Sequence, residues 1–199
     1  MNPVDSFILA RLEAAGLKPV HAASPWEWLR RASFDLTGLP PTPEQVNAFQ
    51  PDDTGTVPES RYAAQVDEWL SSSAFGQRWA RHWLDVARFA ESAGKERNHP
   101  FPEAWRYRDW VVDAFNADKP YAEFVREQIA GDLLATTAPP EQRDALIIAT
   151  GFLAIGTKGL NENRREQFLA DLVDEQIDTT TRAILGITVA CARCHDHKS

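Results

Sequence analysis

The chain has 199 residues, of which 43% are hydrophobic and 25% charged, a composition typical of globular proteins. Ten Phe, seven Trp and three Tyr argue against a chain that stays disordered. The formal net charge of −8 argues against general nucleic-acid binding and against adsorption to anionic lipid, because both require a basic surface. No direct membrane span is expected, because the longest mostly apolar run, residues 145–156, is shorter than the roughly 20 residues required. No signal peptide is visible at the N-terminus.

Capping residues and glycines divide the N-terminal third into short helices. Asn2 is suited to begin a helix that Gly16 ends. The segments SPWE at 24–27 and TPEQ at 42–45 are capping boxes, in which two side chains satisfy free backbone N–H groups at a helix start. The helices predicted here cover residues 3–16, 25–38, 43–49 and 61–70.

Apolar residues recur with a helical period over most of the remaining chain. The strongest stripe runs from Phe75 through Trp79 and Trp83 to Val86, whereas the polar, Gly- and Pro-containing segment 91–103 predicts a loop. The helices predicted here cover residues 74–90, 104–116, 120–134, 141–155 and 164–187. No useful stretch alternates as a strand does. The sequence therefore predicts an all-α fold, a single-domain bundle of about eight or nine helices over residues 1–199.

The two cysteines of the chain stand near its end, in the pattern C-x-x-C-H formed by Cys191, Cys194 and His195. This is the attachment pattern of c-type haem. Two thiols three positions apart can add to the two vinyl groups on one edge of a haem, and the next histidine can then coordinate the iron. The motif therefore predicts haem c as cofactor, with Cys191 and Cys194 forming thioethers and His195 as the proximal iron ligand.

Three other interpretations of the motif stay open. A redox-active dithiol also has the spacing C-x-x-C, but it is expected in a βαβ context, and here the motif follows a predicted helix. Zinc could use both thiols together with His195 or His197, although the chain has no second cysteine pair. The two thiols could also be inert.

A haem iron needs a second axial ligand or an open face. The sole methionine is Met1, at the chain terminus, so His/Met ligation from this segment is not expected. His82 lies between two tryptophans on the strongest aromatic helix and is a candidate distal ligand. The alternative is a core or rim histidine bonded to Asp85 or to a backbone carbonyl. His99 lies in a Pro-flanked loop and is expected to face solvent.

Several arginines lie beside the tryptophan-rich helices. They could form ion pairs with nearby carboxylates or could pair with haem propionates, since guanidinium groups suit both. The arginines are Arg78, Arg81, Arg88, Arg106 and Arg108, and the nearby carboxylates are those of Asp85, Glu91, Asp109 and Asp113.

Long segments of the chain match a family pattern. They are FILARLEAAGLKP at 7–19, LRRASFDLTGLPPTPEQVNAF at 29–49, FGQRWARHWLDVARFAES at 75–92, AWRYRDWVVDAFNADKPYAEFVREQIAGDLL at 104–134, ATGFLAIG at 149–156 and DEQIDTTTRAILGITVACARCHDHK at 174–198. In these segments the chain resembles the planctomycete-type cytochrome c domain family, in the class that precedes a C-terminal domain of unknown function in large exported proteins.

The resemblance implies covalent haem, a periplasmic or cell-surface location, and neighbouring domains of a larger protein as partners. The family pattern continues past Lys198 with a Phe-Asp-Pro stretch, so this chain is expected to be one domain cut after the haem motif.

Two functions of different class follow. The first is covalent c-type haem binding for electron transfer or for a haem-dependent oxidoreductase step; no catalytic residue is assigned, and whether the protein is an enzyme stays open. The second is a non-catalytic module that binds carbohydrate or docks neighbouring domains. Loss of both cysteines distinguishes them, because a scaffold should tolerate it.

Overall fold

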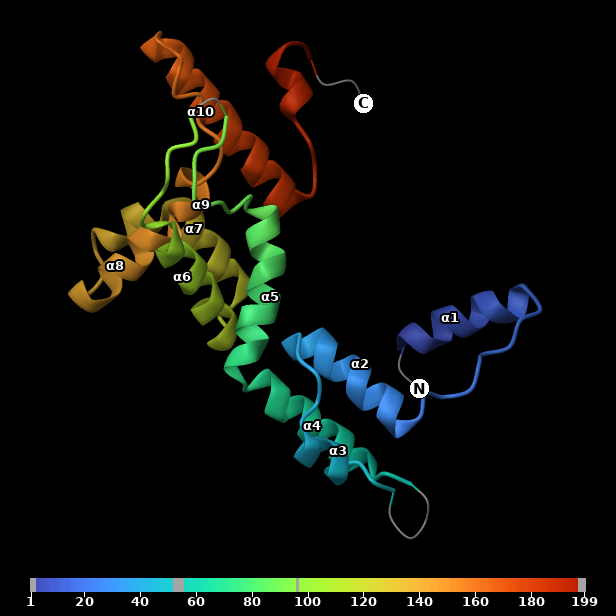
Figure 1. Ribbon diagram of the computed structural model, residues 1–199. Helices are drawn as coiled ribbons and strands as arrows, with labels where there is room; N and C mark the ends of the chain where they lie inside the picture. The colour runs from blue at the N-terminus through green and yellow to red at the C-terminus, as the bar shows by residue number, and fades with distance from the viewer. Residues whose placement is uncertain (1–2, 52–55, 96, 197–199) are drawn as a thin grey trace. The chain divides into compact units, whose positions relative to one another are not determined.

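The computed structural model describes residues 3–51, 56–95 and 97–196, and over these residues the chain is helical (Figure 1). The described residues form ten α-helices, a π-helical turn and a 3₁₀ turn, and they contain no β-strand. The predicted all-α class is therefore confirmed. The chain divides into two compact units, Met1–Asp35 with Leu39–Ala63 and Leu36–Gly38 with Ala64–Ser199, each described by itself. One domain over residues 1–199 stays a prediction.

The first unit contains the predicted capping boxes. Its helices are α1 (Pro3–Ala14), α2 (Pro25–Thr37), which ends in the second unit, α3 (Pro43–Ala48), and the start of α4 (Glu59–Leu70). The Ser24 N–H donates to Glu27 Oε2 at 2.8 Å, and the Glu27 N–H donates to Ser24 Oγ at 3.3 Å. Thr42 and Gln45 repeat this arrangement at 2.9 and 3.3 Å. The starts of α2 and α3 are thus set by local side-chain chemistry.

An aromatic cluster forms the core of the first unit. The Trp28 and Phe49 rings stack with centroids 5.6 Å apart, and the edge of the Tyr62 ring meets both. Phe49 is fully buried. By contrast, α1 has no buried residue, and its apolar side chains are at most half-buried.

The second unit holds the larger core. Its helices, besides the end of α4, are α5 (Ser73–Val86), α6 (Ala104–Asn116), α7 (Tyr121–Ala135), α8 (Pro140–Ala149), α9 (Gly151–Ala154) and α10 (Arg165–Thr180). Helix α5 packs on α6, and α7 packs on α8. At the centre, the Trp83 ring stacks on Phe152 with centroids 5.9 Å apart and meets Phe124 edge-on at 4.8 Å.

A polar network lies inside this core and is satisfied by its own members. Tyr107 Oη donates to Gln128 Oε1 at 2.6 Å, and Trp83 Nε1 donates to the same oxygen at 2.8 Å. Gln128 Nε2 donates to the Phe124 carbonyl at 3.0 Å. Burial raises the pKa of Tyr107 well above its ordinary value, so the phenol stays neutral and keeps its donor. The network fixes the relative register of α5, α6 and α7.

Two predicted helices end early in the structure. Helix α5 ends at Val86 instead of residue 90, because Arg88 adopts a left-handed conformation with φ of 52°. The segment predicted as one helix over 141–155 breaks at Thr150 into α8 and α9. There Gly151 packs so closely that a Cβ would lie 2.9 Å from the Tyr107 ring. Neither break has a strong local signal, since both follow from tertiary contacts.

Other predicted features agree with the structure in outline. The described part of segment 91–103 is a loop, with an isolated β-bridge between Ser92 and Pro100. The predicted stripe of α5 is only partly buried, since Trp79 and Val86 are exposed. The long helix predicted over 164–187 is α10 followed by a π-helical turn, η1 (Thr181–Leu185).

Replacement of Phe152 by Ala is expected to lower the free energy of unfolding by about 3–5 kcal/mol, because it empties a fully buried site next to Trp83. Urea unfolding followed by tryptophan fluorescence measures this. The matched control is Phe7→Ala, at a ring that is 77% exposed, with an expected change within about 0.5 kcal/mol. Equal effects of the two substitutions would contradict this assignment of the core.

Candidate functional site

The C-terminal segment brings the C-x-x-C-H motif back onto the helix that precedes it. The turn η1 ends at Gly186, whose φ of 66° is in the left-handed region that favours glycine. The chain then reverses and enters a 3₁₀ turn, η2 (Ala190–Arg193), which lies alongside α10 (Figure 1). The motif is therefore held against one face of α10.

Both thiols of the motif are accessible on this turn. Cys191 and Cys194 are exposed and are not joined in a disulfide. The Cys194 N–H donates to the Cys191 carbonyl oxygen at 3.2 Å, so the two cysteines stand at the two ends of one backbone turn. The structure therefore presents two free thiols at the surface, one at each end of this turn.

His195 follows the turn with one ring nitrogen already engaged. Its Nδ1 lies 2.8 Å from the Asp196 carbonyl oxygen. A proton on Nδ1 donates to that carbonyl, and Nε2 then carries the free lone pair that a metal ligand needs. With the two exposed thiols, this donor set fits a group that is linked through two sulfurs and ligated by an imidazole.

Arg193, between the two cysteines, anchors the motif to α10. Its Nη1 lies 3.0 Å from Asp174 Oδ2, and its Nη2 pairs with Asp171 Oδ1. Gln167 Nε2 also donates to Asp171 Oδ1, at 2.8 Å. The Arg193 guanidinium, together with the Gln167 amide, lowers the pKa of Asp171 below its ordinary value. One side chain of the motif thus bridges two carboxylates one turn apart on the helix.

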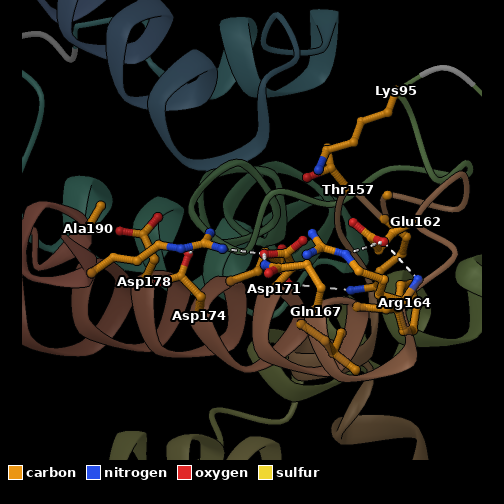
Figure 2. A pocket seen from close by; sticks show the side chains of 15 residues that line it. Lys95, Thr157, Glu162, Arg164, Gln167, Asp171, Asp174, Asp178 and Ala190 are labelled. Carbon is orange, nitrogen blue, oxygen red and sulfur yellow. Dashed lines mark hydrogen bonds and ion pairs between the residues drawn. The ribbon is translucent and has the colours of Figure 1, made fainter.

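A charged pocket of about 550 Å³ lies on this side of α10 (Figure 2). Figure 2 shows Asp178, Asp174, Asp171 and Gln167 in a row along the helix. The charged residues that line the pocket are Lys95, Lys158, Glu162, Arg164, Asp171, Asp174, Glu175, Asp178 and Arg193. Most of these charges pair with one another, so the pocket is polar and nearly balanced in charge.

Glu175 holds α10 on the helical body. Its Oε1 pairs with Arg88 Nε, and its Oε2 lies 3.4 Å from Lys158 Nζ. Arg88 Nη1 also donates to the Phe152 carbonyl at 3.2 Å, which explains the left-handed turn at Arg88. Burial lowers the pKa of Lys158, and Glu175 partly opposes this effect. Gly156, with φ of 131°, leaves room for this cluster that a Cβ would fill.

Two other histidines of the second unit, His82 and His99, lie at the surface. His82 is exposed on α5, with its ring centroid 5.4 Å from that of Trp79, so it does not point into the core. Among the described residues, no hydrogen bond or ring contact joins His82 to Cys191, Cys194 or His195. His99 is exposed, as expected, and His197 lies outside the described residues. A distal-ligand role for His82 stays a prediction.

The arginines beside the tryptophan-rich helices mostly form ion pairs. Arg108 lies 2.8 Å from Asp109 and 3.7 Å from Glu91, as one of the two interpretations predicts. Arg106 pairs with Glu103, one turn earlier. Arg88 pairs across the fold with Glu175, a partner that sequence proximity does not suggest.

The sequence analysis does not predict two features of this site. The first is the pairing of Arg193 with α10, for which a signal exists: Asp171, Asp174 and Asp178 recur at helical spacing. The second is the cluster around Glu175, which joins residues far apart in the chain and has no local signal.

Comparison with known proteins identifies the family but not an activity. The fold and the site define only a class of protein, namely an all-α protein that exposes a C-x-x-C-H turn. The model of the family described as "PSCyt2: Protein of unknown function (DUF1549)" matches residues 3–199, and the chain belongs to this family. No curated protein and no solved structure matches the chain.

The described part of the chain contains neither a metal-binding cluster nor a helix that could cross a membrane. Residues 3–51, 56–95 and 97–196 contain no group of three or more His, Cys, Asp or Glu side chains arranged to hold a metal ion. None of the helices in these ranges combines the length and the apolar character that crossing a bilayer requires.

Replacing both carboxylates that hold Arg193, as Asp171→Asn with Asp174→Asn, is expected to loosen η2. Hydrogen exchange at the amides of Ala192 and Cys194 measures this, with a several-fold loss of protection at neutral pH. Asp132→Asn, at an exposed carboxylate of α7, is the control and should change nothing.

The same measurement has a pH dependence. Arg193 stabilises the charged form of Asp171. The ion pair between them is therefore fully formed above the ordinary Asp pKa of about 3.9, and it weakens as the pH falls through the lowered pKa of Asp171. The pairs are partly exposed, so added salt should weaken them as well. Unchanged protection in the double variant would show that Arg193 does not hold the motif.

Replacing Glu175 by Gln is expected to lower the free energy of unfolding by about 1–3 kcal/mol, because Lys158 and Arg88 then share a half-buried site without a counter-charge. Chemical denaturation measures the change. Glu166→Gln, at an exposed carboxylate on the same helix, is the control with little expected effect. Equal free energies of unfolding for Glu175→Gln and Glu166→Gln would show that Glu175 does not hold α10 on the helical body.

Proposed function

We propose that this chain binds haem c covalently, through Cys191 and Cys194, with His195 as the proximal ligand of the iron. The observation that carries the proposal is the turn closed by the hydrogen bond from the Cys194 N–H to the Cys191 carbonyl, at which both thiols are free and exposed. The hydrogen bond at His195 Nδ1 supports it further, because it leaves Nε2 available for coordination.

The addition of the two thiols to haem is redox-neutral, so it would consume no oxidant or reductant. Each thiol would add across a vinyl group, so that a carbon–sulfur bond forms and the thiol proton goes to the neighbouring carbon. Haem supplies one-electron redox chemistry when it is bound. The role of Arg193 would be to hold both cysteines in position through its two carboxylate partners.

The redox role proposed for the bound protein is electron transfer or a haem-dependent oxidoreductase step. Two strong iron ligands would suit electron transfer, whereas an open iron face would permit substrate chemistry. His82 is the candidate second ligand, although its exposure on α5 gives it no dry pocket of its own. Thioether formation requires a maturation system, so the proposed location is the periplasm or cell surface, with neighbouring domains as partners.

One observation favours the second function, a module that binds carbohydrate or docks neighbouring domains. Trp79 is exposed on α5, with centroid distances of 6.0 Å to Phe75 and 5.4 Å to His82. The exposed Trp79 and His82 rings, with Phe75 half-buried beside them, are suited to stack on a sugar ring or to anchor another protein surface. This surface needs neither cysteine.

The test is expression of the chain with an export signal and a c-type maturation system. The denatured protein is expected to give a haem-stained band on a gel, because thioether bonds survive denaturation. Cys191→Ala with Cys194→Ala should lose the stain completely.

The same double variant controls for folding. Its far-UV circular dichroism should match that of the wild-type protein, because both thiols are exposed and outside the core. A colourless wild-type protein alongside a correctly matured reference cytochrome would overturn the proposal. Carbohydrate or domain binding that is retained in the colourless double variant would support the second function.

A further inference from the structure

Helix α10 carries an apolar stripe beside the motif. Leu169, Val173 and Ile177 recur every four residues and therefore lie along one face. Their exposed fractions are 47%, 52% and 51%. Exposed apolar surface that is contiguous in this way marks a binding site more often than a free surface.

The stripe borders a hollow that reaches the motif itself. Leu169, Ala170, Val173 and Ile177 line a space of about 460 Å³ together with Asp174 and Arg193. Asp174 and Arg193 pair with each other, with Oδ2 and Nη1 3.0 Å apart. The other four lining residues are apolar. Arg193 lies between the two cysteines in the chain and also lines the hollow. A group linked to both thiols would therefore be attached next to the hollow.

The charged pocket on the neighbouring face of α10 is a poor alternative for an apolar ring. Arg193 and Asp174 line both spaces, so their ion pair forms the ridge between them. A flat apolar group in the charged pocket would remove water from Glu162, Lys158 and other charged side chains. On the stripe, the same group would cover apolar surface at no such cost.

We infer that the stripe Leu169–Val173–Ile177 is the surface on which the haem ring lies, an inference that rests on the proposed function. The ring linked to Cys191 and Cys194 passes the Arg193–Asp174 ridge and covers the apolar side chains of α10. Val173 and Ile177 are then haem-contacting residues, and the exposure of the stripe belongs to the haem-free protein.

The experiment compares charged substitutions on and off the stripe in the matured 199-residue chain. Val173→Asp and Ile177→Asp place a carboxylate on the proposed surface. Ile147→Asp, on α8, is the matched control, because Ile147 is 54% exposed and Ile177 is 51% exposed. Without haem, all three variants should have the far-UV circular dichroism and the melting temperature of the haem-free wild-type protein, since each substitution is at an exposed position.

Three readouts report on the haem surroundings. Wild-type protein and Ile147→Asp should melt at a higher temperature with haem than without it, and they should show an induced circular dichroism band in the Soret region. Val173→Asp and Ile177→Asp should lose most of both effects and should have a lower reduction potential, because a nearby negative charge favours ferric iron. If an aspartate variant melts early without haem, Val173→Thr keeps the shape and gives the same comparison.

The outcomes separate this inference from the proposed function. Haem attached to wild-type protein, with stripe variants that behave as Ile147→Asp does, overturns the inference and leaves the proposed function standing. Wild-type protein that attaches no haem overturns both. A haem-free dimer in sedimentation that Val173→Asp dissociates, together with unchanged haem readouts, would assign the stripe to a second copy and overturn the inference as well.

Discussion

The candidate site depends on the ion pairs by which Glu175 joins α10 to the helical body. Arg88, just after α5, and Lys158, just after α9, both reach this carboxylate, and Gln176 adds a hydrogen bond of 3.2 Å to the Leu153 carbonyl. These groups are half-buried, where a charge without a partner is costly. Their pairing therefore fixes where α10 lies, and α10 in turn carries the carboxylates that hold Arg193. The position of the cysteines therefore depends on two sets of ion pairs, those of Glu175 and those of Arg193.

The two faces of α10 differ in chemistry. One face carries the acidic side chains that bind Arg193 and line the charged pocket, and the other carries the stripe Leu169–Val173–Ile177. A helix with an apolar stripe normally buries it against the core. Here the core contact of α10 is partly ionic, through Glu175, and the apolar stripe is left at the surface beside the C-x-x-C-H motif. The family assignment gives no activity, so this local chemistry is what supports a function.

Local chemistry explains why much of the fold could be predicted. The capping boxes at Ser24 and Thr42 act within one helical turn, and the helix starts that they predict are confirmed. The breaks at Arg88 and Thr150 could not be predicted in the same way. Arg88 adopts its left-handed conformation while binding Glu175 and the Phe152 carbonyl, both distant in sequence, and the chain at Thr150 accommodates the Tyr107 ring beside Gly151. Such contacts override the preference of a segment for one continuous helix.

The sequence by itself determined the all-α class and the reactive groups of the candidate site, because helical period, capping and the C-x-x-C-H spacing are local properties. The tertiary structure alone decided that Arg193 binds α10, that His82 is exposed on α5, and that the stripe of α10 stays uncovered. A helical period shows which residues share a face. Which partner that face meets depends on contacts between distant segments, and these form only when the whole chain folds.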